Sequence, residues 1–208
     1  MSSSVYSIVL QDEVVSAIDK LSFTEHTSRS NMINRILAQK VGLVTREGRI
    51  DDIFAILESF VSQHSQLASL GRGDAYFAAR SAIQYKYNPS VRYIVELTDG
   101  EELCRLRVSL RTQNSVLIAH LNRFFSVWLS CESEYAVSQI DDGRFTRYLN
   151  CPKSISSAEQ AGFAISEYIS LFDKALKAYF DALPSAEFAA SSTKQIYQIG
   201  ANDIILQL

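Results

Sequence analysis

The chain has 208 residues, of which 47% are hydrophobic and 21% are charged, and its formal net charge is −3. This length accommodates one large domain, or a small domain joined to a medium one. The acidic balance argues against a protein that coats nucleic acid regardless of sequence, because such binding draws on a surplus of Lys and Arg. It still allows a compact domain that reads DNA through a few placed contacts.

Compartment and redox state follow from what the sequence lacks. No apolar run approaches the roughly 18 residues of a membrane-spanning helix, and the first residues lack the charged and apolar regions of a signal peptide. We therefore expect a cytoplasmic protein with no membrane partner. Cys104, Cys131 and Cys151 are odd in number and lack CxxC spacing, which favours reduced thiols over a disulfide framework or a zinc site.

Residues 5–10 alternate in character and predict a short strand. Its two faces carry Tyr6, Ile8 and Leu10 on one side and Val5, Ser7 and Val9 on the other. A first helix is expected from Asp12 to Leu21, because its apolar residues recur at helical spacing. The acidic pair Asp12-Glu13 lies at the favourable N-terminal end of its dipole.

Residues 22–27 interrupt this helical pattern, and a second helix is expected after them. The run Ser28-Arg29-Ser30-Asn31 supplies an N-cap, and apolar residues resume their spacing from Met32 to Val41. Gly42 is expected to end the second helix in the C′ position.

The rest of the chain predicts an α+β domain over residues 51–208. Residues 43–50 are polar and indicate a linker, and an amphipathic helix is expected over 51–70. Expected strands cover 76–87, 91–98, 103–111, 135–140 and 144–149, with hairpin turns at Asp99-Gly100 and Asp141-Asp142-Gly143. Expected helices cover 115–129 and 156–183, the second ended by Pro184, and residues 204–206 predict a short strand.

The ordered set of strand, helix and capped helix resembles the ribbon-helix-helix family of bacterial repressors and antitoxins. The resemblance covers residues 5–42, about a fifth of the chain. It rests on Tyr6-Ser7-Ile8-Val9-Leu10, Asp12-Glu13, Ile18-Asp19-Lys20-Leu21 and Ser28-Arg29-Ser30-Asn31-Met32-Ile33. The Ser-Arg-Ser run followed closely by an apolar pair is its most informative part. We therefore expect a DNA-binding and dimerisation domain over residues 1–45.

The resemblance implies a homodimer in which the strands of two copies pair antiparallel as a ribbon. A single copy of such a module buries too little apolar surface to offset the loss of chain entropy. The expected shared core consists of Tyr6, Ile8, Leu10, Ile18, Ile33, Ile36 and Leu37.

The resemblance also implies contacts with the major groove of double-stranded DNA. Val5, Ser7 and Val9 would face the base edges, and Ser28, Arg29 and Ser30 would bind a phosphate at the N-terminus of the second helix. None of the three strand residues can make the bidentate contact that Arg, Lys, Asn or Gln supply in many family members. Gln11 stands where the family usually has Pro.

The basic and acidic residues of the module are equal in number, so attraction to DNA has to come from the local placement of individual charged and polar groups. The basic residues of segment 1–48 are Lys20, Arg29, Arg35, Lys40 and Arg46, and the acidic ones are Asp12, Glu13, Asp19, Glu25 and Glu47. A dimer of dimers on tandem half-sites would suit such a weak reader, because linked contacts raise the effective concentration.

The sequence thus predicts a sequence-specific DNA-binding regulator that acts as a repressor, with a C-terminal domain for oligomerisation or for a ligand or protein partner. The alternative is an interaction protein that uses the N-terminal module only to dimerise and does not bind DNA. We expect no enzyme and no cofactor, because no P-loop, GxGxxG, GxSxG or HExxH motif occurs.

Two further groups of residues have side chains that could bind an anion or a metal ion. Arg105, Arg107, Ser109 and Arg111 would share one strand face, which could hold an anionic ligand or, as we favour, form a solvated face paired with Glu96, Glu101 or Glu102. His26, His64 and His120 lie in different elements without carboxylate or cysteine at ligand spacing, so no metal site is expected.

Overall fold

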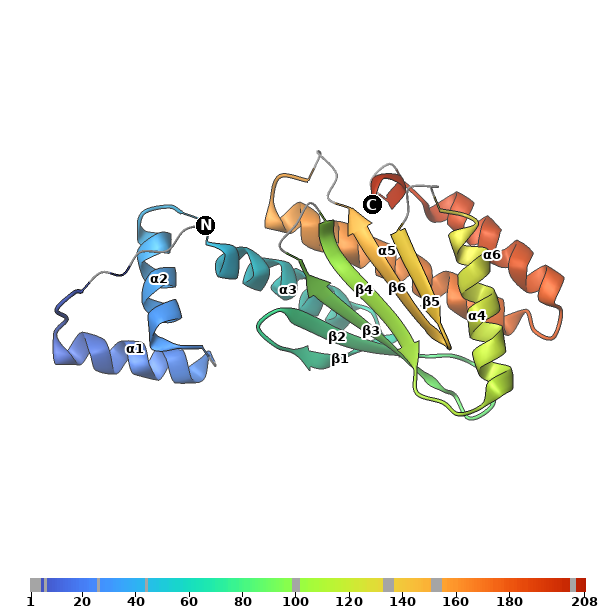
Figure 1. Cartoon of the computed structure of the whole chain (residues 1–208), viewed down its shortest axis with the longest axis horizontal. Helices are drawn as coiled ribbons and strands as arrows, with labels where there is room; N and C mark the ends of the chain where they lie inside the picture. The colour runs from blue at the N-terminus through green and yellow to red at the C-terminus, as the bar shows by residue number, and fades with distance from the viewer. Residues whose placement is uncertain are drawn as a thin grey trace. The chain divides into compact units, whose positions relative to one another are not determined.

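The computed structural model describes residues 5, 7–25, 27–43, 45–98, 102–132, 137–150, 155–202 and 205–208. The chain forms two compact units, residues 1–49 and residues 50–208 (Figure 1). The described residues contain six α-helices and a six-stranded antiparallel sheet, so the expected α+β class is confirmed.

The unit of residues 1–49 contains two consecutive helices, α1 (Asp12–Thr24) and α2 (Arg29–Lys40). Ile18 and Met32 are its buried hydrophobic side chains among the described residues. The Ser22 hydroxyl, also buried, donates to the carbonyl oxygen of Ile18 at 2.8 Å. Helix α1 continues through residues 22–24, where the sequence predicted a break, and there the polar Ser22 side chain has a partner within the helix.

The strand expected over residues 5–10 is not formed, and the prediction of a ribbon-helix-helix arrangement is not supported in the single chain. Val5 and residues 7–10 carry no strand, and the first regular element is α1; Tyr6 lies outside the described residues. A strand requires a neighbouring strand to pair with its backbone N–H and C=O groups. The described part of residues 1–49 offers none.

The expected linker at residues 43–50 is also corrected, because α3 spans Arg46–Gln63. The Thr45 hydroxyl accepts a hydrogen bond from the Gly48 N–H at 3.0 Å, which gives α3 an earlier start than the apolar pattern indicated. The helix ends at Gln63 rather than at residue 70. Leu67–Arg72 form strand β1 instead.

The sheet has the strand order β1-β2-β3-β4-β6-β5, and all neighbouring strands are antiparallel. Its other strands are β2 (Tyr76–Ala82), β3 (Ser90–Leu97), β4 (Glu102–Leu110), β5 (Val137–Asp141) and β6 (Arg144–Asn150). The second hairpin turn is confirmed at Asp142 and Gly143, whose φ angles are 37° and 78°. The turn expected at Asp99-Gly100 lies outside the described residues.

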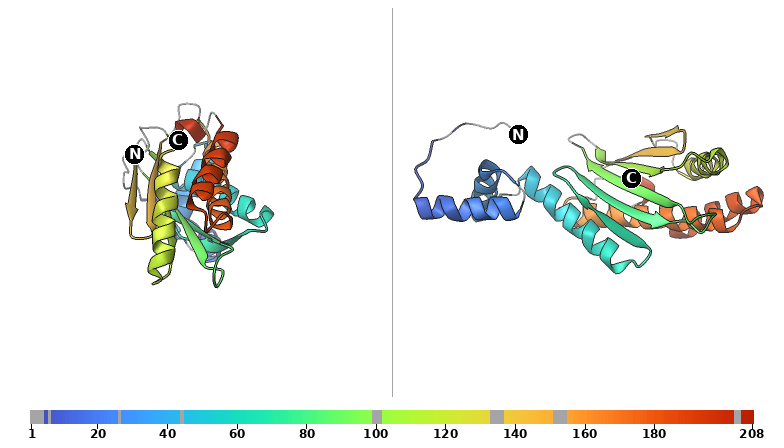
Figure 2. Two further views of the ribbon diagram at one scale, coloured as in Figure 1. Left: turned by 90° about the vertical axis from the view of Figure 1, so that its right-hand side faces the viewer. Right: turned by 90° about the horizontal axis from the view of Figure 1, so that it is seen from below.

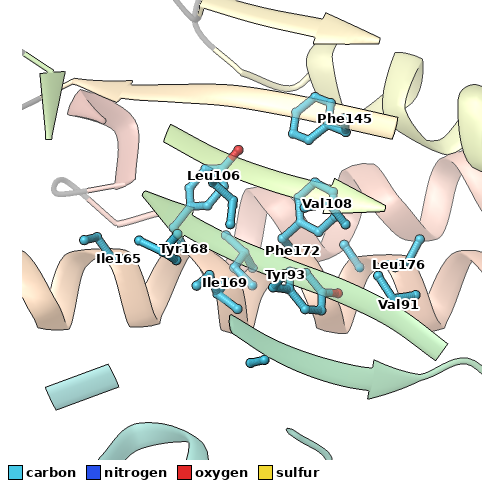
Figure 3. Close-up of a cluster of buried hydrophobic side chains, with 14 of the residues drawn as sticks. Val91, Tyr93, Leu106, Val108, Phe145, Ile165, Tyr168, Ile169, Phe172 and Leu176 are labelled. Atoms are coloured by element: carbon cyan, nitrogen blue, oxygen red, sulfur yellow. The ribbon is translucent and has the colours of Figure 1, made fainter. Parts of the chain in front are cut away.

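One face of the sheet packs against α5 (Ala158–Asp181), which runs behind the strands in Figure 1. Figure 2 gives two further views of this layered arrangement in residues 50–208. Phe172 of α5 lies in the middle of an aromatic cluster, with its ring centroid 4.9 Å from that of Trp128 and 5.3 Å from that of Phe124. Figure 3 shows side chains of β3, β4 and β6 meeting those of α5. The core of residues 50–208 therefore lies on this one face of the sheet.

Helices α4 (Ser115–Leu129) and α6 (Ala186–Gly200) complete this unit. The bounds of α4 agree with the prediction, and its residues Phe124, Phe125 and Trp128 are fully buried. No helix was predicted where α6 lies, because its buried face at Ala189, Thr193 and Tyr197 is only weakly apolar. The strand expected at 204–206 is wrong for residues 205 and 206, because Ile205–Gln207 form a 3₁₀ turn, and residue 204 lies outside the described residues.

Candidate nucleic-acid interface

The N-terminus of α2 carries the cap that the sequence predicted. The Ser28 hydroxyl accepts a hydrogen bond from the backbone N–H of Asn31 at 3.2 Å. At the other end, Gly42 adopts a φ of 71°, and the N–H of Leu43 donates to the carbonyl of Ala38 at 2.8 Å. Both ends of α2 are thus defined by local sequence.

The Arg29 side chain, expected at a phosphate, binds Asp19 of α1 instead. Its Nε and one terminal nitrogen donate to the two carboxylate oxygens at 2.5 and 2.6 Å. The hydrogen bond to Asp19 and the charge of Asp19 raise the pKa of the guanidinium. The backbone N–H groups of Arg29 and Ser30, in the first helical turn, have no acceptor within the helix.

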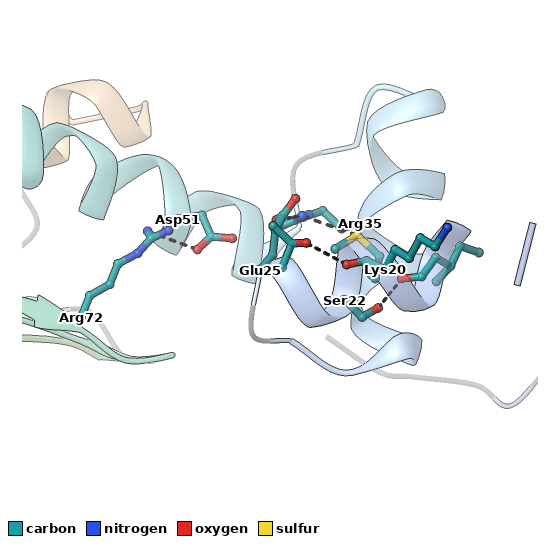
Figure 4. A network of polar contacts seen from close by, with 9 residues as sticks. Lys20, Ser22, Glu25, Arg35, Asp51 and Arg72 are labelled. Carbon is teal, nitrogen blue, oxygen red and sulfur yellow. Dashed lines mark hydrogen bonds and ion pairs between the residues drawn. The ribbon is translucent and has the colours of Figure 1, made fainter. Parts of the chain in front are cut away.

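A second ion pair neutralises another basic side chain of the same unit. Arg35 of α2 contacts the carboxylate of Glu25, and its guanidinium also lies 3.5 Å from the sulfur of Met32 (Figure 4). Two of the cations that could meet a phosphate backbone are therefore engaged within the unit.

Apolar side chains remain exposed on residues 1–49. Of the expected dimer core, Ile18 is buried, Leu10 and Ile33 are partly buried, and Ile8, Ile36 and Leu37 are 58%, 39% and 54% exposed. Val5 and Val9, expected at the base edges, are fully exposed, and Ser7 is exposed too. Further large hydrophobic side chains exposed on this unit are Val14, Leu21, Phe23, Val41 and Leu43.

The open face of the sheet is polar and rich in arginine. Arg105 and Arg107 of β4 both contact the carboxylate of Glu96 on β3. The hydrogen bonds to Glu96 and to Tyr148 raise the pKa of Arg105. The favoured interpretation, a solvated face paired with Glu96, is confirmed for these two arginines; Glu101 lies outside the described residues.

A line of three further arginines crosses the same face and was missed by the sequence analysis. Cross-strand pairing places Arg80 of β2 opposite Arg92 of β3, Arg92 opposite Ser109 of β4, and Ser109 opposite Arg144 of β6. We call Arg80, Arg92 and Arg144 the arginine row. All three are exposed, and none forms an ion pair within the described part of the chain.

A buried polar network joins the sheet to the helices. Arg147 of β6 pairs with Glu132 at 3.1 Å, and their side chains are 4% and 3% exposed. The Tyr168 hydroxyl donates to the same carboxylate at 2.5 Å and accepts from the Trp128 indole N–H at 3.0 Å. Burial, followed by the charge of Glu132, raises the pKa of Tyr168 well above its usual value. Glu132 is thus committed to internal partners.

A hollow of about 470 Å³ lies near this network. Its lining consists of Ser130, Cys131, Lys194, Tyr197, Gln198, Ala201 and Leu206. Burial raises the pKa of Tyr197 to about 12 and also raises that of the Cys131 thiol. Burial therefore favours the neutral form of both groups.

The described histidines and cysteines are dispersed over the fold. His64 lies 2.8 Å from the carbonyl of Phe60, and the His120 ring packs near Tyr85 and Phe180, while His26 lies outside the described residues. Neither Cys104 nor Cys131 is joined in a disulfide within the described part of the chain, and Cys151 also lies outside the described residues. Within the described ranges no three His, Cys, Asp or Glu side chains gather as metal ligands.

Comparison with family models, curated proteins and solved structures found no match for this chain. Among the helices that the structure describes, none has the length and apolar character to cross a membrane.

Proposed function

We propose that the protein is a dimeric regulator that binds double-stranded DNA through residues 5–10 and the N-terminus of α2. The observation that carries this proposal is the uncovered apolar surface of residues 1–49, next to a segment of alternating character and two helices with defined ends. A second copy of the chain would supply the missing strand for residues 5–10 and cover Ile8, Ile36 and Leu37.

A second copy of the chain fits this surface better than an unrelated partner, because residues 5–10 of two copies complement each other when they pair. Two antiparallel copies of an alternating strand would present the same apolar face to the helices below and the same face outward. The outward face would then carry Val5, Ser7 and Val9 to the major groove. The N–H groups of Arg29 and Ser30 would bind a phosphate, while the Arg29 side chain stays with Asp19.

The experiment compares Ile8→Asp with Val9→Asp in the full chain by analytical ultracentrifugation. Ile8→Asp should give a monomer, because its charge would enter the shared interior. Val9→Asp places the same charge on the outward face and should leave the dimer intact while abolishing DNA binding. A dimeric Ile8→Asp variant would refute the proposed packing.

A second candidate, dimerisation without DNA binding, is favoured by the ion pairs Arg29–Asp19 and Arg35–Glu25, which cancel cationic charge. Selection of duplexes from a random pool, followed by a salt titration, separates the two candidates. A DNA reader enriches a sequence and loses affinity steeply with salt. A protein that only dimerises does neither, and the same result would overturn the primary proposal.

A further inference from the structure

We propose that the open face of the sheet in residues 50–208 binds single-stranded nucleic acid, with the arginine row on its phosphates. This site belongs to the second unit alone and is separate from the proposed ribbon of residues 5–10. It rests on the positions of Arg80, Arg92 and Arg144 and on the side chains that surround them.

The charge on this face departs from that of its unit. Residues 50–208 contain 14 basic and 18 acidic residues, yet most of the charged side chains described at the paired outward positions of β2, β3, β4, β5 and β6 are arginines. These outward charges are Arg80, Arg92, Arg105, Arg107 and Arg144 against Glu96 and Asp141. Glu96 already binds Arg105 and Arg107, and Asp141 stands opposite Arg144 in the pairing of β5 with β6, so the positive charge most available to a ligand is that of Arg80 and Arg92.

The length of the arginine row favours a repeating anion. Neighbouring strands lie about 4.8 Å apart, so the three strand intervals from Arg80 to Arg144 span about 14 Å. Small ligands are usually enclosed by concave sites, whereas this row crosses an open sheet face. A polymer with regularly spaced phosphates can meet all three guanidinium groups, each of which can bind phosphate in a bidentate manner.

The neighbouring side chains favour a single strand over a duplex. Next to the arginine row lie Ile94 and Arg107, and the row beyond runs from Tyr76 through Glu96, Arg105 and Tyr148 to Val137. Tyr76 is 47% exposed, and its ring lies over Gly73, where a Cβ would come within 2.5 Å of the ring. Apolar, guanidinium and tyrosine surfaces stack with unpaired bases, which a duplex keeps inside.

The test measures binding of the full chain to a 30-nucleotide oligo(dT) and to a random-sequence duplex of equal length, by fluorescence anisotropy. In Arg80→Ala/Arg92→Ala, the affinity for oligo(dT) should fall at least tenfold. The slope of log K against log salt should become about 1.4 less steep, since each lost phosphate contact removes about 0.7. Arg80→Lys/Arg92→Lys should keep the slope.

The matched control is Arg123→Ala/Lys174→Ala, which removes the same charge from exposed positions on α4 and α5. It should change oligo(dT) affinity less than twofold. Tyr76→Leu should reduce oligo(dT) affinity at least fivefold without changing the salt slope, because it removes stacking and no charge. Circular dichroism checks that each variant is folded.

Unchanged oligo(dT) affinity in the Arg80→Ala/Arg92→Ala variant would overturn the proposal. An equal loss of affinity for the duplex would instead indicate that this face of the sheet binds the backbone of double-stranded DNA. If the arginine row were needed for binding phosphatidylserine vesicles and the chain did not bind oligo(dT), the face would be a membrane-binding surface. Either of these two results also overturns the proposal. Ser7→Ala/Val9→Ala should retain oligo(dT) binding while losing duplex preference, so this site and the ribbon can fail independently.

Discussion

The two units of the chain differ in how completely they bury their own apolar side chains. In residues 50–208, Phe172 and the rings around it are fully buried between the sheet and helices. In residues 1–49, Ile18 and Met32 are buried, but several other large apolar side chains on α1 and α2 stay exposed. We infer that the second unit is stable on its own, whereas the first depends on a second copy of the chain.

The largest expected effect on stability comes from removing the Phe172 ring at the centre of the second unit. Phe172→Ala should lower the free energy of unfolding of residues 50–208 by about 3–5 kcal/mol, because it leaves a cavity among packed rings. Phe163→Ala, on an exposed site of the same helix, should cost within about 0.5 kcal/mol. Denaturant unfolding measures both changes.

Protein concentration sharpens the same experiment. The midpoint for residues 50–208 should not change with concentration, whereas the midpoint for residues 1–49 should rise with it, because dimerisation stabilises the folded state by mass action. A first unit whose midpoint is independent of concentration would contradict the inferred difference between the units.

The next effect compares an ion pair from each unit. Glu132→Gln should cost about 3–5 kcal/mol, because it leaves the charge of Arg147 buried without a counter-charge. Asp19→Asn should cost about 0.2–1 kcal/mol, because Asp19 and Arg29 are 45% and 56% exposed and water screens their attraction. Thermal and urea unfolding of both variants test this, and similar losses would show that burial does not separate the two pairs.

The contrast between the units also explains which parts of the fold could be predicted. Helix α4 and the turn at Asp142-Gly143 followed from the sequence, because an apolar helical stripe and a residue pair that tolerates positive φ act locally. The cap at Ser28 is local in the same way. The prediction of a strand at residues 5–10 was wrong for the single chain. A strand depends on a second strand to pair with, and a local sequence pattern does not show whether one is present.

Two other features were missed because their sequence signal was weak or was spread over several strands. Helix α6 was missed because Thr193 on its buried face is polar, its hydroxyl bonded to the carbonyl of Ala189 at 2.9 Å. The arginine row was missed because Arg80, Arg92 and Arg144 lie on three strands and are aligned only by cross-strand register. The alternation of side chains along β2 and β3 could have predicted that their arginines point outward. It could not have predicted that the arginines align across the strands.

A smaller effect should appear at alkaline pH in the second unit. Burial raises the pKa of Tyr197 to about 12, whereas an unfolded tyrosine titrates near 10. Tyr197 therefore contributes stability that is fully present below pH 10 and is lost as the pH rises towards 12, amounting to about 2–3 kcal/mol. The pKa values of Tyr93 and Tyr168 are raised too, so their contributions are lost in the same direction.

Urea unfolding of residues 50–208 at several pH values from 9 to 12 measures this loss. Tyr197→Phe should make the decline shallower, because it removes one of the groups that release a proton on unfolding. An equally steep decline in the variant would show that Tyr197 does not contribute.

A last pair of variants, with a stability change of about 1 kcal/mol, separates the stability of the first unit from its proposed function. Ser28→Ala should cost about 1 kcal/mol, because the N–H of Asn31 loses its acceptor at the start of α2. Ser28→Asp keeps an acceptor and should preserve stability, but it puts a negative charge where a phosphate is proposed to bind. Its affinity for the selected duplex should therefore fall at least tenfold, while Ser28→Ala keeps most of its binding. If Ser28→Asp bound the duplex as tightly as the unchanged chain, α2 would stabilise the unit without meeting DNA, and the difference between the units would be one of dimerisation alone.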